Sequence, residues 1–275
     1  MWRLNKPKIE EAVSKDIQKL ANEIALSPIV RTKLRNLYVN YDSQGGYVTD
    51  AQISTITLDD ASKIYDTYSK TYDGKRLSYI RTELMQDVFK CPYCGIAQPT
   101  TLDHYLPKSD YKALAVCRMN LVPMCGVCNN YKNAKEYADF IHCYYEKFPD
   151  TIFLVAEVFI KNNRFAVKFS FNLSAINNLN LRKKLCKQEK EIRLFNRLLK
   201  ESTVYISTLC SECEVKDTDS LKLWLDRRLN KSEILYGKND WRCAILRGLL
   251  ALKTLDISII ESYNSDPVII NKEGV

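Results

Sequence analysis

Four cysteines of this 275-residue chain form two Cys-x-x-Cys pairs, Cys91–Cys94 and Cys125–Cys128, with thirty residues between them. Thiolates at such a spacing are typical ligands of structural zinc, which takes four of them in a closed tetrahedral shell. A closed shell leaves no position for water, so we expect this zinc to stabilise the fold rather than to catalyse. The other cysteines have no matched second pair, and we expect them to be reduced, buried thiols: Cys117, Cys143, Cys186, Cys210, Cys213 and Cys243.

An aspartate and a histidine lie side by side between the two cysteine pairs, at Asp103 and His104. An imidazole, with an ordinary pKa of about 6.5, can take a proton from water at neutral pH. Neighbouring side chains on a strand point to opposite faces, so the two residues can share one task only where a strand ends or bends. A turn at Pro107 makes such an arrangement plausible.

Three short segments carry a resemblance to a known family. They are Leu102–Ser109 (LDHYLPKS), Asn120–Pro123 (NLVP) and Cys128–Lys132 (CNNYK), in this order and framed by the cysteine pairs. Together they resemble the zinc-stabilised HNH endonucleases of the His-Me finger, or ββα-metal, superfamily. The resemblance covers about residues 90–135.

This resemblance implies a role for each of four residues. Asp103 would bind a divalent cation, and His104 would be the general base. Asn120 would hold the histidine loop by hydrogen bonds, and Asn129 would be a second metal ligand. Carboxylate and amide oxygens suit Mg²⁺ or Mn²⁺ better than a second zinc. The implied reaction is hydrolysis of phosphodiester bonds in nucleic acid, with DNA preferred and RNA possible.

A second resemblance concerns the wider context. The segment LDHYLPKS, with NLVPMC and the aromatic stretch FIHCYYEKF, is similar to HNH subunits of bacterial antiphage systems of the Septu type. Such subunits work with a separate SMC-like ATPase. This chain has no G-x-x-x-x-G-K-[ST] sequence, so nucleotide-driven control would have to come from that partner.

The charge of the chain favours a polyanionic partner. Its formal net charge is +8, and eight basic against two acidic residues lie between Arg182 and Lys200. Such a strip could follow phosphates. It could equally be the solvated face of one helix whose apolar side is formed by Leu185, Ile192, Phe195 and Leu199.

The residue patterns predict a mainly α protein with an embedded ββα-metal motif, a four-cysteine zinc site and a short β-hairpin. Residues 1–89 are expected to be helical, 90–150 to hold the nuclease motif, and 151–275 to form a hairpin followed by helices. The hairpin would turn at Asn162-Asn163. No long apolar run predicts a membrane span, and we expect a cytoplasmic protein.

Each functional interpretation has a structural alternative. His104 could be a core histidine, and Asn129 could cap a helix over residues 129–140. Lys132 and Lys135 are better explained as exposed helix residues than as phosphate ligands, and His142 is expected to pack in the core. The chain as a whole could be a noncatalytic zinc module that binds nucleic acid, or a subunit that docks an ATPase.

Overall fold

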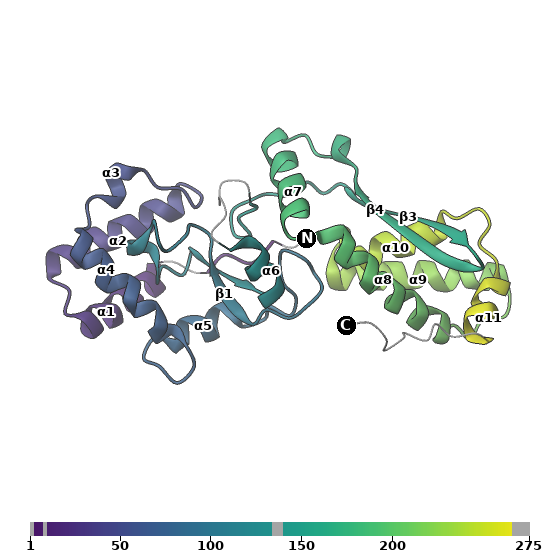
Figure 1. The fold of residues 1–275 in the computed structure, drawn as a ribbon, viewed down its shortest axis with the longest axis horizontal. Helices are drawn as coiled ribbons and strands as arrows, with labels where there is room; N and C mark the ends of the chain where they lie inside the picture. Colours follow the sequence, from purple (N-terminus) through teal and green to yellow (C-terminus); the bar gives the residue numbers. More distant parts are fainter. Residues whose placement is uncertain (1–2, 8–9, 134–139, 266–275) are drawn as a thin grey trace. The chain divides into compact units, whose positions relative to one another are not determined.

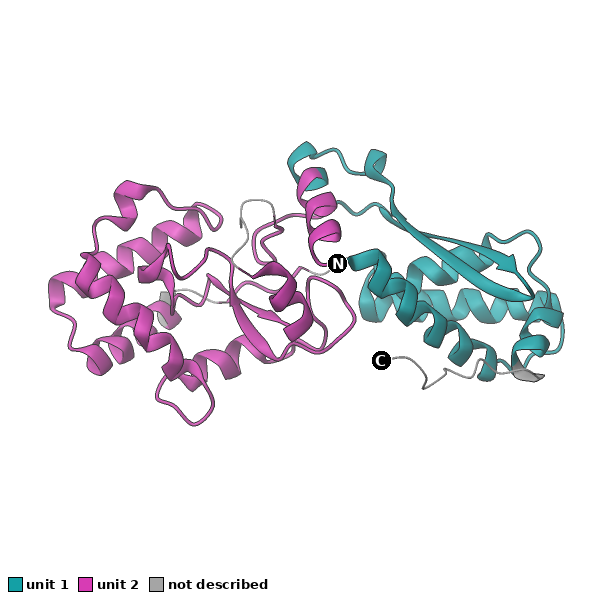
Figure 2. Ribbon diagram, in the orientation of Figure 1, with its two compact units in different colours: residues 1, 149–182, 193–275 teal, residues 2–148, 183–192 magenta. Residues whose placement is uncertain are grey.

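A computed structural model describes residues 3–7, 10–133 and 140–265 of the chain (Figure 1). Their contacts divide the chain into two compact units (Figure 2). Unit 2 holds residues 2–148 and 183–192, and unit 1 holds residues 149–182 and 193–275 together with Met1. The segments expected at 1–89 and 90–150 thus fall almost wholly in unit 2. Within the described residues, no helix has the length and apolarity to cross a membrane.

Helices form the N-terminal part of unit 2, as the sequence predicts. Side-chain oxygens cap several of them: Ser27 accepts from Val30 N, and Thr49 forms a reciprocal capping box with Gln52. These caps satisfy amide groups that have no partner inside the helix. The elements are α1 (Glu10–Ile24), α2 (Pro28–Ser43), α3 (Asp50–Ile53), α4 (Leu58–Asp66), the 3₁₀ turn η1 (Thr67–Thr71) and α5 (Ser78–Met85).

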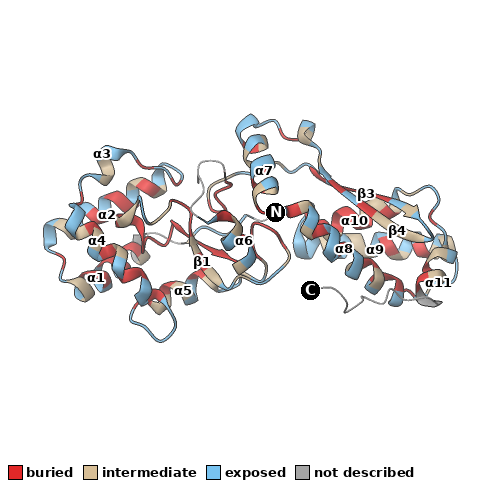
Figure 3. Ribbon diagram, viewed as in Figure 1, coloured by how far each residue is buried: buried red, intermediate tan, exposed pale blue. Residues whose placement is uncertain are grey.

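Two short antiparallel strands and a helix follow in unit 2. Strand β1 (Thr101–His104) pairs with β2 (Leu121–Met124), and His104 lies opposite Leu121. The 3₁₀ turn η2 (Lys112–Leu114) lies in the connection, and α6 (Gly126–Lys132) begins directly after β2. Strand β2 is buried along its whole length, whereas β1 alternates between half-buried and buried residues (Figure 3). The side chains of β1 can therefore reach both the core and the solvent.

Unit 1 is built on the predicted hairpin. Strand β3 (Leu154–Lys161) pairs with β4 (Arg164–Phe171), and the turn residues Asn162 and Asn163 both have positive φ. Asparagine tolerates this conformation better than most residues, which confirms the predicted turn. Alternate residues of β3 are buried, and the strand packs on α10 (Trp241–Leu250). A Cβ at Gly248 would lie 2.3 Å from Ala156 O, so only glycine permits this close approach.

The basic strip between Arg182 and Lys200 does not lie on one continuous helix. Helix α7 (Leu179–Glu191) ends before Arg193, which has a φ of 50°, and α8 (Leu194–Ser211) begins after it. Residues 183–192 belong to unit 2 and residues from 193 onward to unit 1. The alternative interpretation, in which these basic residues form the solvated face of one helix, is therefore wrong. Three more helices complete unit 1: α9 (Thr218–Tyr236), α10 and α11 (Ile257–Ser265).

Candidate functional site

The four cysteines of the two predicted knuckles lie together. Their sulfur atoms are all within 4.8 Å of one another and all four residues are buried. The Sγ atoms of Cys94 and Cys125 are 3.8 Å apart. Tetrahedral zinc with bonds of about 2.3 Å places its sulfur ligands about 3.8 Å apart. The donor set and its spacing therefore fit structural zinc.

Local backbone geometry brings the thiols together. Gly95 has a φ of 65° and its amide donates to Cys91 O at 2.8 Å, which closes the first knuckle. In the second knuckle Cys125 is the N-cap of α6, and its sulfur accepts from Cys128 N. A hydrogen bond from Cys128 lowers the pKa of the Cys125 thiol, whereas burial raises the pKa of Cys91. Burial thus opposes ionisation of all four thiols unless a bound cation balances the charge of the thiolates.

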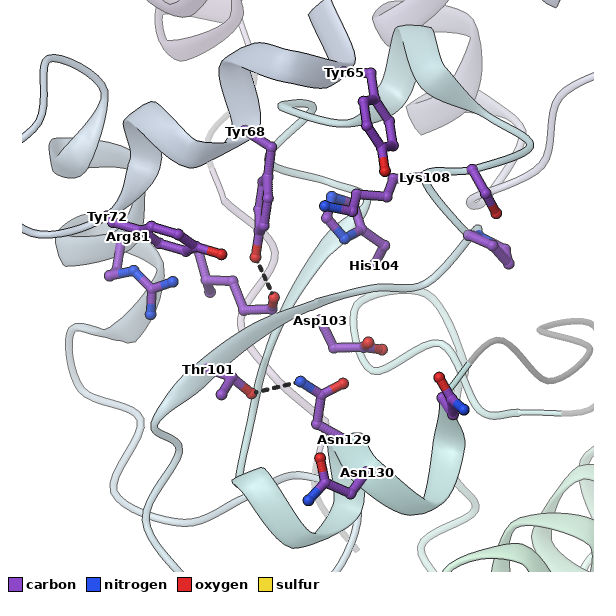
Figure 4. Close-up of a pocket in the computed structure, with 14 residues that line it drawn as sticks. Tyr65, Tyr68, Tyr72, Arg81, Thr101, Asp103, His104, Lys108, Asn129 and Asn130 are labelled. Atoms are coloured by element: carbon purple, nitrogen blue, oxygen red, sulfur yellow. Dashed lines mark hydrogen bonds between the residues drawn. The ribbon is translucent and has the colours of Figure 1, made fainter.

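A pocket of about 630 Å³ opens over β1, and its lining includes Asn129, which follows Cys128 of the cluster directly (Figure 4). It brings together three of the four residues singled out in the sequence, namely Asp103, His104 and Asn129. Since His104 ends β1, both members of the Asp-His pair reach the same pocket. The lining also includes Tyr65, Tyr68, Tyr72, Arg81, Thr101, Leu102, Pro107, Lys108, Ser109, Asn130 and Asn133.

One ring nitrogen of His104 is held by the backbone. Its Nε2 lies 2.8 Å from Ala115 O, and because a carbonyl can only accept, Nε2 carries the proton. The ring also packs against Tyr68, with centroids 4.4 Å apart. Burial lowers the pKa of His104 to about 4. The imidazole is therefore neutral at pH 7, and Nδ1 is the atom that can accept a proton.

Asp103 forms an ion pair that the sequence did not predict. Its Oδ2 lies 2.7 Å from Lys132 Nζ, and the same ammonium donates to His104 O at 2.8 Å. Lys132 is only 1% exposed, so its interpretation as an exposed helix residue is wrong. Burial raises the pKa of Asp103, and Lys132 opposes that shift. The contact of Oδ2 with this ammonium is thus an ion pair rather than a hydrogen bond of good geometry.

The orientation of the Asn129 amide follows from its neighbour. Thr101 Oγ1 donates its one proton to Met124 O at 2.9 Å, so it can only accept from Asn129 Nδ2 at 3.3 Å. The amide oxygen of Asn129 is then left on the side of Asp103 (Figure 4). Two oxygen donors thus face the same part of the pocket.

Asn129 does not cap a helix, contrary to the structural alternative. Helix α6 begins three residues earlier with Cys125 as its cap, and it ends at Lys132. The helix expected over residues 129–140 therefore begins earlier than predicted, at Gly126, and α6 ends earlier, at Lys132. Lys135 lies outside the described residues.

Asn120 lies behind the pocket, fully buried. Its Oδ1 accepts from Leu106 N and from Tyr41 OH, and its Nδ2 donates to Leu106 O and Leu114 O. These bonds fix the turn after His104, as the resemblance implies for this position. Tyr41 OH in turn lies 3.1 Å from His142 Nε2. His142 is 1% exposed and does not line the pocket, so it packs in the core as expected.

The tyrosine side of the pocket was missed by sequence reasoning. Tyr65, Tyr68 and Tyr72 come from the end of α4, from η1 and from the residue after it. Tyr68 OH donates to Leu102 O at 2.6 Å, and burial raises its pKa to about 12. The spacing of these residues, three and then four positions apart, places them on one helical face and was the available signal.

The remaining cysteines are buried with one exception. Cys117, Cys143, Cys210, Cys213 and Cys243 are buried, as predicted. Cys186 is exposed, which contradicts the expectation for this residue.

Comparison with known proteins identifies no relative. No family model, no curated protein and no solved structure gives a significant match to the chain. The assignment of the site therefore depends on its own geometry.

Substitution of Cys125 by Ser is expected to release the metal. Three thiolates bind zinc less well than four, and loss of a structural metal destabilises a domain by more than about 4 kcal/mol. Zinc content by mass spectrometry and thermal unfolding measure the two effects. The matched control is Cys186→Ser, which alters an exposed thiol outside the cluster. Equal zinc content in the two variants would contradict the assignment.

The two members of the buried Asp103–Lys132 pair are expected to contribute to stability together rather than independently. Lys132→Met leaves the Asp103 carboxylate unpaired and should lower the free energy of unfolding by about 3–5 kcal/mol. The double variant Asp103→Asn/Lys132→Met should lose less than the sum of the single losses. Urea unfolding of the four proteins measures the coupling. Additive losses would show that the two charges do not interact.

Acid is expected to destabilise the fold through His104. Its pKa is lowered in the folded state, so between pH about 6.5 and about 4 the unfolded chain binds a proton that the folded chain does not. As the pH is lowered through this window, the free energy of unfolding should decrease. The contribution of His104 is at most about 1.4 kcal/mol per pH unit. In urea unfolding, the free energy of unfolding of His104→Gln should depend less steeply on pH than that of the wild type. Equal pH dependence in the two proteins would disprove the effect of burial on His104.

Proposed function

We propose that this chain is a divalent-metal-dependent endonuclease that hydrolyses phosphodiester bonds in nucleic acid, with the chemistry of the HNH enzymes. One observation carries the proposal: a histidine with one nitrogen fixed by a carbonyl shares a pocket with two oxygen ligands. The order of elements supports it, because two antiparallel strands, β1 and β2, precede a helix beside a four-cysteine cluster.

His104 would act as the general base. The hydrogen bond from Nε2 to Ala115 O sets the tautomer and makes Nδ1 the proton acceptor, although the burial that lowers the pKa of His104 to about 4 also weakens it as a base. Lys132 holds the carbonyl oxygen of the same residue, and Asn120 holds the turn that follows. These contacts fix the ring position before substrate arrives, which reduces the reorganisation required in the reaction.

Asp103 and Asn129 would hold Mg²⁺ or Mn²⁺. Both offer hard oxygen donors on one side of the pocket. A bound divalent cation would polarise the phosphoryl oxygen and stabilise the leaving 3′ oxygen. Arg81 and Lys108 in the pocket lining add positive charge that attracts a phosphate.

A second function, nucleic-acid binding without cleavage, is favoured by the ion pair of Asp103. Lys132 already neutralises this carboxylate, which weakens its attraction for a divalent cation. The SMC-like ATPase partner and the antiphage role implied by the resemblance stay predictions. Metal-dependent cleavage by the purified chain distinguishes the nuclease from the noncatalytic module.

Cleavage is expected to require both a divalent cation and His104. Purified protein with Mg²⁺ or Mn²⁺ should cut DNA or RNA, and chelation of that cation should stop cleavage. His104→Ala should reduce the rate by about 10²- to 10⁴-fold, the usual contribution of a general base. Gel assays on plasmid, single-stranded circular DNA and RNA measure the loss.

Two controls make this test specific. His104→Ala should keep its zinc content, and added imidazole should restore part of the cleavage by replacing the missing base. Tyr47→Ala, at a tyrosine that is 61% exposed and outside the pocket lining, should cut at the wild-type rate. Undiminished cleavage by His104→Ala would remove this residue from its proposed role.

A further inference from the structure

One wall of the pocket is lined by tyrosines, which hydrolysis of a phosphodiester does not itself require. Tyr65, Tyr68 and Tyr72 line one side, opposite Asn129 and Asn130 (Figure 4). Tyr68 is 7% exposed, and its contacts with Leu102 O and the His104 ring give it a structural role. Tyr72 differs, because it is 48% exposed at the pocket lining. Its ring is therefore accessible to a ligand.

Two cations, Arg81 and Lys108, lie beside the tyrosines. Arg81 lies with Cζ 5.4 Å from the Tyr72 ring centre, and Lys108 Nζ lies 4.9 Å and 4.7 Å from those of Tyr65 and Tyr68. The side chain of Arg81 donates only long hydrogen bonds, to the carbonyls of Thr71 and Thr100. Within the described part of the chain neither cation forms an ion pair. Both charges are thus available to an anion.

The two cations stand at opposite ends of β1. Arg81 contacts Thr100, just before the strand, whereas Lys108 lies over Tyr68, whose ring packs on His104 at the strand's other end. Three residue steps along a strand span about 10 Å. A ligand that contacts both cations must therefore be extended and carry more than one negative group. A nucleic-acid strand has this property.

We propose that the pocket binds an unpaired nucleic-acid strand, with a base stacked on Tyr72 and with Arg81 and Lys108 on phosphates to either side of Asp103 and His104. This inference rests on the proposed function and names its substrate class. Aromatic rings can stack on a base only where its face is exposed, and in a duplex the faces are covered by neighbouring base pairs. Tyrosines beside unpaired cations are the combination found in single-strand binding sites.

Binding measured without added divalent cation tests the inference separately from cleavage. The probes are a fluorescein-labelled DNA strand, an RNA strand of the same sequence and the blunt DNA duplex, followed by fluorescence anisotropy. We expect at least one of the single strands to bind about tenfold or more tightly than the duplex. Comparison of the DNA strand with the RNA strand shows which of the two nucleic acids the pocket prefers. Equal or tighter binding of the duplex would overturn the proposal.

Substitutions at Tyr72 identify the stacking contact. Tyr72→Ala should weaken strand binding about 5- to 150-fold, the range expected for one stacked base, whereas Tyr72→Phe should bind as the wild type does because it keeps the ring. The matched control is Tyr47→Ala, which removes an exposed tyrosine outside the pocket lining. Unchanged binding by Tyr72→Ala would overturn the proposal.

Salt dependence tests the phosphate contacts. Between about 50 mM and about 200 mM salt, Arg81→Gln and Lys108→Gln should each reduce the slope of log affinity against log salt by about 0.7, the contribution of one phosphate on a single strand. Slopes equal to that of the wild type would overturn the assigned contacts.

The two proposals fail in different ways. Strand binding that depends on Tyr72, without cleavage under any metal condition, would support the inference and reject the nuclease. Cleavage of DNA that depends on His104, with no effect of Tyr72→Ala on binding or cleavage, would support the nuclease and reject the unpaired-strand site.

Discussion

The cluster of four thiols links the segment before β1 to the first turn of α6, and Asn129 of the candidate site lies directly beside it. Cys91 and Cys94 precede β1, and Cys125 and Cys128 lie at the start of α6, so one cluster joins the strand to the helix. Asn129 follows Cys128 directly and faces Thr101 of β1. Two strands of four residues each have little capacity to hold this geometry alone. A metal held by the thiols would supply the missing rigidity.

A buried ion pair behind the pocket wall neutralises one charge of the site. The ammonium of Lys132 lies between the Asp103 carboxylate and the carbonyl of His104, and it is removed from solvent. The Asp103–Lys132 pair carries no net charge, while Arg81 and Lys108 form no ion pair with any residue that the structure describes. The pocket as a whole is therefore positive in the absence of ligand. A phosphate would restore the balance and favour the entry of a divalent cation with it.

Sequence reasoning was most successful where few residues determine the local structure. The cysteine spacing predicted the cluster, the Asn162-Asn163 pair predicted the hairpin turn, and the adjacent Asp103 and His104 were correctly placed at a strand end. It failed for Lys132, because a lysine on a short helix is exposed unless a distant segment covers it. It also failed at the start of α6, where a cysteine rather than Asn129 caps the helix.

The sequence by itself determined the four cysteines of the candidate zinc site, the helical character of the flanks and the candidate acid-base residues, because each depends on residue type and on spacing within a few positions. The tertiary structure alone decided which side chains meet across long separations. Tyr68 reaches β1 from thirty-four residues away, and Tyr41 reaches Asn120 from seventy-nine. Such contacts follow from how α2, α4 and η1 pack around β1 and β2, and packing is a property of the whole unit rather than of any local pattern.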